Sequence, residues 1–292
     1  MEEYQNIEKG MGLITLDDSV LRFEGKDLSK FLQGILSNDL RLLTANQSLC
    51  ACFLNAKGKW IAALQLFQVE SAIFAKTSPL EAKNLLQAIQ ALILFSDSKV
   101  EDKSEEYQWI LGIGAQAHAW LADQKLAYPS FQCEGYRLPS FLILCPRAEM
   151  ESWMASHASQ GISPETLEVL RIESCLPLYG QDVDDKTIPI EAGLDSHISY
   201  TKGCYVGQET ISRIKHYGRV NKRLVRVKIR GQEIPKIGDD VSLQDKDLGK
   251  ISSLCYSPFF QTNLALSILS QEAKAGDLVK ISAGRIEGEV VE

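Results

Sequence analysis

The sequence predicts an α+β protein that ends in a small all-β domain. Over the first two hundred residues, apolar positions at strand spacing alternate with apolar positions at helical spacing. From Lys222 onward the helical pattern stops, and short strand-like runs are separated by Gly, Pro, Asn and Asp. A chain of 292 residues exceeds the usual size of one domain, so we expect two or three packed units with clefts between them.

The first elements are strands and a helix. Residues 11–24 contain two short apolar runs split by Asp17-Asp18, which predicts a hairpin. A helix capped by Asp27 should follow, because apolar residues recur at helical spacing until residues 37–39 end the pattern. Strand-like runs at residues 48–54 and 60–69 then predict a second hairpin around the turn-forming residues between them.

Two later helices should open with a Ser-Pro pair, in which Ser is the N-cap and Pro the first helical residue. These pairs are Ser78-Pro79 and Ser163-Pro164. A further helix is expected at residues 147–157. Buried strands are expected at residues 107–113 and 141–145, and the strands of a C-terminal barrel at residues 222–230, 240–243, 248–256, 264–269 and 277–282.

Composition and simple motifs exclude several classes of protein. A net charge of −7, with 45% hydrophobic and 24% charged residues, is typical of a folded soluble protein rather than a disordered one. The acidic N-terminus does not resemble a signal peptide, and no stretch reads as a membrane span. Seven scattered cysteines without C-x-x-C spacing argue against a disulfide framework or zinc site, and no hydrolase or P-loop motif occurs. We therefore expect a cytoplasmic protein without a bound metal.

The segment from Thr201 to Glu209, TKGCYVGQE, is the part of the sequence that least resembles an element with a purely structural role. Glycines on both sides of Cys204 would let the backbone approach a ligand and leave the thiol accessible, and Lys202 could lower the pKa of that thiol. The structural alternative is a glycine-rich turn that holds a small buried cysteine. The local context favours a functional thiol.

Positive charge is concentrated in residues 201–230. This segment holds nine Lys and Arg residues against Glu209 alone, although the whole chain is acidic. Such a reversal suggests an anionic partner, either a small polyanion or the phosphates of a nucleic acid. Arg226, Lys228 and Arg230 would also fit the solvated face of a barrel strand, whereas Arg213, Lys215 and Arg219 have no such explanation.

A carboxylate stands in an otherwise apolar run, Ile188 to Leu194. Such a group needs partners, and a planar ligand edge with adjacent N–H donors would satisfy Glu191. The equally supported alternative is a glutamate that caps a helix or lies on the surface.

The octapeptide KGCYVGQE, residues 202–209, resembles the signature of the YgfZ family, folate-binding proteins related to the T protein (aminomethyltransferase) of the glycine cleavage system. Further similarity covers residues 25–40, 54–59 (LNAKGK), 171–180, 188–194 and 213–224. The resemblance implies a T-protein-like arrangement of three domains, two α+β (ferredoxin-like) units plus a C-terminal small β-barrel. It also implies the boundaries 1–48 plus 160–220 for a split folate-binding domain, 49–159 for a second α+β domain, and 221–292 for the barrel.

The resemblance further implies a tetrahydrofolate site in a central opening and a functional thiol. Cys204 would be that thiol with Lys202 beside it, and Glu191 would meet the pterin, whose amino group and ring N–H form a paired donor edge. The residues implied to bind the cofactor are Glu191, Asn38, Asp39, Lys57, Arg171, Tyr205, Gln208, Glu209 and Arg213. Implied partners are folate, iron–sulfur enzymes or their assembly proteins and, as an alternative, tRNA.

The sequence also departs from the family pattern. Where the T protein has two catalytic aspartates after its N-x-x-G turn, this chain has Ala62-Ala63, so aminomethyl transfer is not expected. Ser19 stands where some family members place a tryptophan beside the folate, and Cys175 replaces a usual glycine. The leading hypothesis is a folate-dependent accessory protein for iron–sulfur enzymes, including tRNA-modifying ones. The alternatives are a folate-dependent C1 transferase and a tRNA-binding module.

Overall fold

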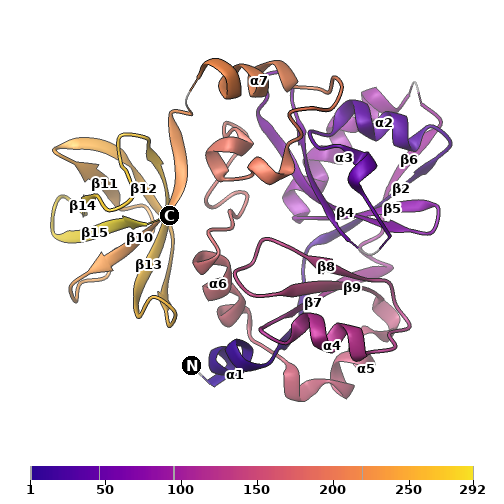
Figure 1. Cartoon of the computed structure of the whole chain (residues 1–292), viewed down its shortest axis with the longest axis horizontal. Helices are drawn as coiled ribbons and strands as arrows, with labels where there is room; N and C mark the ends of the chain where they lie inside the picture. The colour runs from indigo at the N-terminus through magenta and orange to yellow at the C-terminus, as the bar shows by residue number, and fades with distance from the viewer. Residues whose placement is uncertain (1, 46, 95, 219, 292) are drawn as a thin grey trace.

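The computed structural model describes residues 2–45, 47–94, 96–218 and 220–291. Its strands form two open sheets and one closed barrel. Figure 1 shows the barrel at the left and the two sheets with their helices one above the other at the right. The predicted fold class, α+β units followed by a small β-barrel, is confirmed.

The upper sheet has five strands in the order β3-β4-β5-β2-β6. Helices α2 (Leu28–Ile35) and α3 (Pro79–Ile93) pack on one of its faces and bury Leu32, Phe53 and Leu85 in a common core. Helix α3 begins as predicted, because the Ser78 hydroxyl accepts the Glu81 N–H at 3.4 Å. The strands are β2 (Ser19–Gly25), β3 (Leu49–Leu54), β4 (Trp60–Val69), β5 (Ala72–Thr77) and β6 (Ser98–Asp102).

The lower sheet has the order β1-β7-β9-β8. One face is covered by helices α4 (Ala117–Asp123) and α5 (Arg147–Ser156). The other face meets the upper sheet across an aromatic core in which Phe67 packs against Trp109 and Phe131. The strands are β1 (Gly12–Leu16), β7 (Tyr107–Ile113), β8 (Ser130–Cys133) and β9 (Ser140–Pro146), and helix α1 (Glu2–Lys9) precedes them.

The hairpin predicted at residues 11–24 is wrong. The two strands exist, but β1 pairs with β7 of the lower sheet while β2 pairs with β5 and β6 of the upper sheet. Asp17-Asp18 therefore lies where the chain crosses between sheets. Alternating apolar residues give both strands a buried face, but they do not specify which strand is the neighbour.

The barrel closes in the order β10-β13-β12-β11-β14-β15. Its interior is filled by side chains such as Val227, Val241 and Val290, all completely buried. Arg226 and Lys228 lie outside, as expected from strand alternation, and their cationic groups contact the ring of Phe260. The strands are β10 (Lys222–Arg230), β11 (Asp240–Leu243), β12 (Lys246–Ser257), β13 (Thr262–Ser270), β14 (Leu278–Ile281) and β15 (Ile286–Val291).

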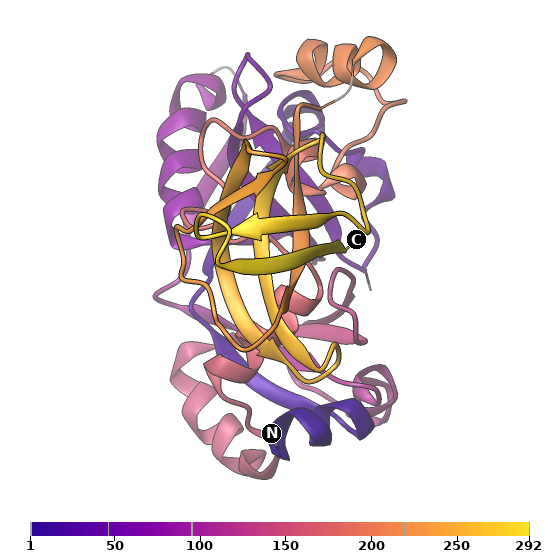
Figure 2. The ribbon, with the colours of Figure 1, turned by 90° about the vertical axis from the view of Figure 1, so that its left-hand side faces the viewer.

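Residues 158–217 run between the barrel and the two sheets. Figure 2, with the barrel in front, shows this connection behind and above it. Its helices are α6 (Pro164–Glu173) and α7 (Gln208–Tyr217), with short 3-10 turns η2 (Ala158–Gln160), η3 (Pro189–Ala192) and η4 (Asp195–His197). Another 3-10 turn, η1 (Leu40–Leu42), follows α2.

The implied domain boundaries stay a proposal about how the chain divides. In the structure β2 shares a sheet with β3 to β6, whereas β1 joins β7 to β9. Each open sheet thus draws strands from both sides of the boundary at residue 48.

Candidate functional site

A cavity of about 380 Å³ lies where the two open sheets, α6 and residues 176–197 meet. Its size suits a fused heteroaromatic ring system. The lining residues come from strands (Leu16, Cys50, Trp60, Ala63, Leu64, Gln65, Lys76, Thr77), from α3 and its cap (Ser78, Glu81), from the β8–β9 loop (Glu134, Gly135, Tyr136), from α6 (Pro164, Leu167, Glu168, Arg171), and from Asp18, Leu176, Pro177, Leu178, Tyr179, Leu194 and His197.

The lining carries four acidic and two basic side chains. Lys76 Nζ lies 3.2 Å from Asp18 Oδ1, and Arg171 pairs with Glu168. Two carboxylates of the lining, Glu81 and Glu134, have no ion-pair partner among the described residues. The cavity is therefore better matched to a ligand that donates hydrogen bonds than to a polyanion.

Three uncharged polar groups also line the cavity. Burial lowers the pKa of His197 to about 4, so its imidazole is neutral at pH 7. Burial raises the pKa of the Tyr136 hydroxyl to about 12, which keeps it protonated. The buried Oγ1 of Thr77 has no hydrogen-bond partner in the part of the chain that is described. The residues thus offer an uncharged, polar surround for a ring with its own donors and acceptors.

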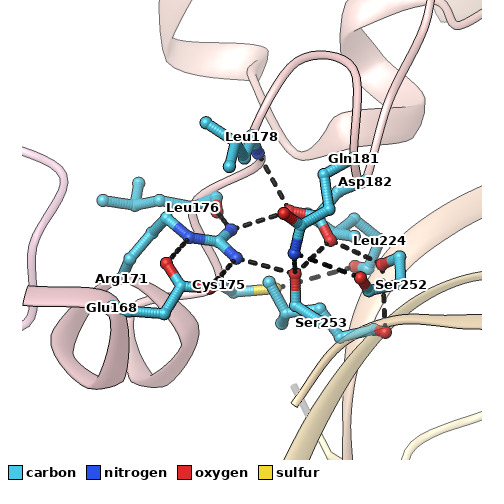
Figure 3. A network of polar contacts seen from close by, with 11 residues as sticks. Glu168, Arg171, Cys175, Leu176, Leu178, Gln181, Asp182, Leu224, Ser252 and Ser253 are labelled. Atoms are coloured by element: carbon cyan, nitrogen blue, oxygen red, sulfur yellow. Dashed lines mark hydrogen bonds and ion pairs between the residues drawn. The ribbon is translucent and has the colours of Figure 1, made fainter. Parts of the chain in front are cut away.

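Of the predicted site residues, only Arg171 lines this cavity. Figure 3 shows its guanidinium inside a polar network that links α6 to the barrel. All its N–H groups are used: it contacts both oxygens of Glu168, the Leu176 carbonyl, the Asp182 carboxylate and the Ser253 hydroxyl at 2.5–2.7 Å. Arg171 is therefore engaged within the fold and presents no free donor to a ligand.

Asn38 and Asp39 likewise hold the chain together after α2. The Asn38 amide donates to the carbonyls of Cys50 (2.7 Å) and Ser196 (3.0 Å), which joins η4 to the upper sheet. The Arg41 guanidinium beside Asp39 holds the pKa of that carboxyl well below its usual range. Neither side chain lines the cavity.

Glu191 caps the N-terminal end of η3. Its Oε2 accepts the Ile188 N–H at 3.0 Å, and the Glu191 N–H donates to the Ile188 carbonyl. The local role is thus the capping one considered in the sequence analysis. Among the described residues the carboxylate accepts no other hydrogen bond. Glu191 is half-buried and precedes the lining residues Leu194 and His197.

The two glycine-containing motifs pack against each other. Gly207 has φ +83°, and a Cβ there would lie 2.6 Å from the Asn55 carbonyl oxygen. Gly58 has φ +71°, and a Cβ there would lie 2.8 Å from Cβ of Thr210 in α7. The KGCYVGQE segment is therefore docked on the LNAKGK turn, and Gly207 serves this close backbone approach rather than contact with a ligand.

Lys202 is buried, with 5% of its surface exposed. Its ammonium donates to the carbonyls of Gln33, Leu36 and Asn38 at 2.7–2.8 Å, where α2 ends. All three protons are used there, so an effect on the Cys204 thiol would act through charge and not through a hydrogen bond. Burial lowers the pKa of Lys202 to about 8.

Cys204 is exposed, and it differs in this from all six other cysteines, which are buried or half-buried. Desolvation raises the pKa of each of those six thiols, for example to about 11 for Cys50 and Cys175. The neighbouring Gly203 has nothing within 4 Å of an added Cβ. The Cys204 thiol is therefore accessible to solvent, and its neighbour Gly203 is not packed against other atoms.

The remaining predicted residues surround this segment. Tyr205 is buried, with its ring 5.2 Å from Lys202 Nζ, and the Gln208 amide reaches the Gly203 carbonyl at 3.5 Å. Lys57, Glu209 and Arg213 are exposed. Arg219 lies outside the described residues. Lys57, Tyr205, Gln208, Glu209 and Arg213 thus lie on or next to α7, and none of them belongs to the cavity lining.

Ala62 and Ala63 face opposite sides of β4. Ala62 is buried beneath the helices, and Ala63 is part of the cavity wall. No group of three or more His, Cys, Asp or Glu side chains within the described ranges could hold a metal ion. Within the same ranges, no helix is both long and apolar enough to cross a membrane.

No motif or spacing in the sequence marks Glu81, the Lys76 and Asp18 pair, or His197 as site residues. Glu81 follows Ser78 by three residues, a spacing that signals a capping box but says nothing about a cavity. Lining groups from β5, α3 and η4 become neighbours only through the tertiary fold.

Comparisons with known proteins agree with this architecture. Residues 222–292 match the family described as the glycine cleavage T-protein C-terminal barrel domain. The aminomethyltransferase of Caldanaerobacter subterraneus subsp. tengcongensis is 24% identical over 313 residues, which cover 96% of this chain and 83% of that protein. The tRNA-modifying protein YgfZ of Yersinia pestis (strain Pestoides F) is 28% identical over 252 residues, 80% of this chain and 75% of that protein.

The fold itself is that of a T protein. The crystal structure of the glycine cleavage system aminomethyltransferase T from Bartonella henselae superposes with a TM-score of 0.86. The superposition covers all of this chain and 87% of that one, at 19% sequence identity. The chain thus has a T-protein-like fold and is similar in sequence to both aminomethyltransferases and YgfZ proteins.

Proposed function

We propose that this chain binds tetrahydrofolate in its central cavity and serves as an accessory protein for iron–sulfur enzymes, with Cys204 as the working thiol. The observation that carries the proposal is a ring-sized cavity in a T-protein-like fold. Ala63 lies in the cavity wall, and the resemblance to the T protein implies a catalytic acid at that position. The site keeps room for the cofactor and lacks the acid pair for aminomethyl transfer. Similarity to a protein named as tRNA-modifying supports the accessory role.

Glu191, which does not itself line the cavity but precedes the lining residues Leu194 and His197, is the proposed partner of the pterin. Its Oε2 already accepts the Ile188 N–H, and its other oxygen is available to the paired donor edge of the ring. The carboxylates of the folate tail would point toward Arg213 and Lys215, which are exposed on α7. Lys57, exposed on the turn beneath α7, adds a third cation to this side.

Cys204 supplies the proposed chemistry toward partners. An exposed thiol can meet an iron–sulfur enzyme, a cluster assembly protein or a persulfide, and exposed cations lie on α7 and on the turn beneath it. The same cations fit the tRNA-binding alternative, which requires RNA affinity that falls steeply with salt. The C1-transferase alternative rests on the aminomethyltransferases among the relatives, and it requires that the chain form methylenetetrahydrofolate from an aminomethylated lipoyl carrier.

Equilibrium titration with tetrahydrofolate, for the wild type and for Glu191→Ala, tests the proposed pose. The wild type should bind at one site, and the variant should lose about 1.5–3 kcal/mol of binding free energy, the usual contribution of a charge-assisted hydrogen bond. Thermal unfolding of both proteins controls for the lost capping bond. Unchanged affinity in a folded Glu191→Ala protein would remove Glu191 from the folate site.

A further inference from the structure

Glu81 places a carboxylate on the wall of the central cavity, at the point where β5 ends beside β4. Strands β4 and β5 pair Gln65 with Lys76, so the next position on this side of β4, Ala63, would face Ser78, but β5 has already ended. The Glu81 carboxylate takes the place of the missing strand. Its Oε1 accepts the Ala63 N–H at 2.8 Å and the Trp60 indole N–H at 2.7 Å, and its Oε2 accepts the Ser78 hydroxyl at 2.6 Å.

This carboxylate is buried without a cation. Glu81 is 5% exposed and belongs to no ion pair among the described residues. Buried carboxylates are costly unless they are paired or fully hydrogen-bonded. Glu81 and all three of its donors line the cavity. A carboxylate has about four acceptor positions, so one remains for a donor in the cavity.

We infer that Glu81 makes the cavity selective for a reduced folate over its oxidised form. The inference rests on the proposed folate site. In the tetrahydro ring N5 and N8 carry hydrogens and can donate, whereas in fully oxidised folic acid both are lone-pair acceptors. A buried carboxylate accepts from the first ring and repels the second. The contact differs from that of Glu191, because the amino group and N3–H of the pterin are present in both oxidation states.

A purely structural Glu81 predicts a different result. In that case the carboxylate only caps α3 and closes the edge of β4, and its loss lowers stability without changing which folate is preferred. The ratio of the two dissociation constants therefore separates the roles, because a general loss of stability does not alter it.

The experiment measures the dissociation constants of tetrahydrofolate and folic acid, under anaerobic conditions, for the wild type, Glu81→Gln and Glu165→Gln. Gln keeps the shape and one acceptor oxygen but turns the other end into a donor. Glu165 is the matched control, since it lies in the first turn of α6, which also opens with Ser-Pro, and it is exposed and absent from the lining. The wild type should prefer tetrahydrofolate, and Glu81→Gln should reduce this preference about tenfold or more. Glu165→Gln should keep the preference.

Three results would overturn the inference: a wild type that binds both folates equally or prefers folic acid, an unchanged ratio in Glu81→Gln, or an equal reduction in Glu165→Gln. Wild-type protein that binds neither folate would instead refute the proposed function. Should Glu81→Gln fail to fold, the wild type is titrated with the 5-deaza and 8-deaza analogues of tetrahydrofolate. One of them should bind about tenfold more weakly than the parent, and equal affinity for all three would contradict the inference.

Discussion

Cys175 shows how one backbone angle explains a residue that the sequence left unexplained. It follows α6 with φ +55°, in the left-handed region. The Leu176 N–H donates to the Arg171 carbonyl, as in the motif that ends many helices with glycine. A glycine is usual at such a position because an L-residue costs about 1–2 kcal/mol in this conformation. The side chain is half-buried, with Sγ 4.0 Å from the Leu224 carbonyl oxygen (Figure 3).

Replacing Cys175 separates the backbone cost from the side-chain contact. Cys175→Gly and Cys175→Ala both remove the sulfur, but only glycine relieves the left-handed strain. The glycine variant should therefore be more stable than the alanine variant by about 1 kcal/mol. Urea unfolding of the two proteins measures the difference, and equal stability would mean that Cys175 is not strained.

Cys204 should be the first cysteine to react with an alkylating reagent. It is exposed, whereas burial raises the pKa of the other thiols. Brief treatment with iodoacetamide near pH 7.5 followed by peptide mass mapping should find most of the label on Cys204. Earlier labelling of any buried cysteine would contradict this order of reactivity.

The Cys204→Ser variant then tests whether the sulfur is used. It should fold normally, keep its tetrahydrofolate affinity and fail to restore iron–sulfur enzyme activity in cells that lack this protein. Full complementation would end the claim for a working thiol.

At the scale of elements, the end of α2 is tied to the KGCYVGQE segment. A helix leaves its last carbonyls without intrahelical donors. The Lys202 ammonium donates three hydrogen bonds to carbonyls at and just after the end of α2. The same ammonium lies over the aromatic ring of Tyr205. The lysine of the motif is thus explained by helix capping across the chain, without any role for a ligand.

Lys202→Met should lower the free energy of unfolding by about 1–3 kcal/mol, because it leaves buried carbonyls without a donor.

The effect of Lys202→Met on the free energy of unfolding should depend on pH. Burial lowers the pKa of Lys202 to about 8, against about 10.4 in an unfolded chain, so between these values only the unfolded chain holds the proton. The stability of the wild type relative to the variant should therefore rise with pH through that window. Chemical denaturation at pH 7, 8.5 and 10 measures this, and a falling difference would contradict the assignment.

The sequence predicted local elements better than their partners. The Ser-Pro helices α3 and α6, the β3–β4 hairpin and the barrel strands β10 and β11 are confirmed, because caps, turns and periodicity are local signals. The predicted pairing of β1 with β2 is wrong, because alternating apolar residues identify a strand but do not determine which strand it pairs with. Helix α7 was not predicted, since its charged sequence has few apolar positions and it is held by glycine contacts with the LNAKGK turn.

At the scale of the whole molecule, the barrel is fastened to the sheets by two buried carboxylates of the connecting segment. Asp182 binds Arg171 and the hydroxyls of Ser252 and Ser253. The Glu173 carboxylate accepts a hydrogen bond from the hydroxyl of Tyr4, in α1, at 2.6 Å. It accepts a second one from the hydroxyl of Ser257, in barrel strand β12, at 2.5 Å. These contacts fix α6 between the barrel and the sheets, and α6 in turn forms one wall of the cavity.

The cavity itself could not be read from the sequence. Its charged groups come from residues as far apart as Asp18, Glu81, Glu134 and Arg171. The motifs that carry the family resemblance mark the docking of α7 and the exposed thiol, and among the predicted site residues only Arg171 reaches the lining. The KGCYVGQE and LNAKGK segments contribute no residue to the lining, whereas the family-like segments 171–180 and 188–194 contribute six.

Binding of tetrahydrofolate inside this cavity is the central claim, and blocking the cavity tests it most directly. Ala63→Phe places a ring in the wall, whereas the matched Ala122→Phe adds the same ring to an exposed site on α4. Calorimetric titration of folded proteins should find one tetrahydrofolate site in the wild type and in Ala122→Phe, and affinity at least about a hundredfold weaker, some 2.7 kcal/mol, in Ala63→Phe. Equal affinity in all three proteins would show that folate does not bind in the central cavity.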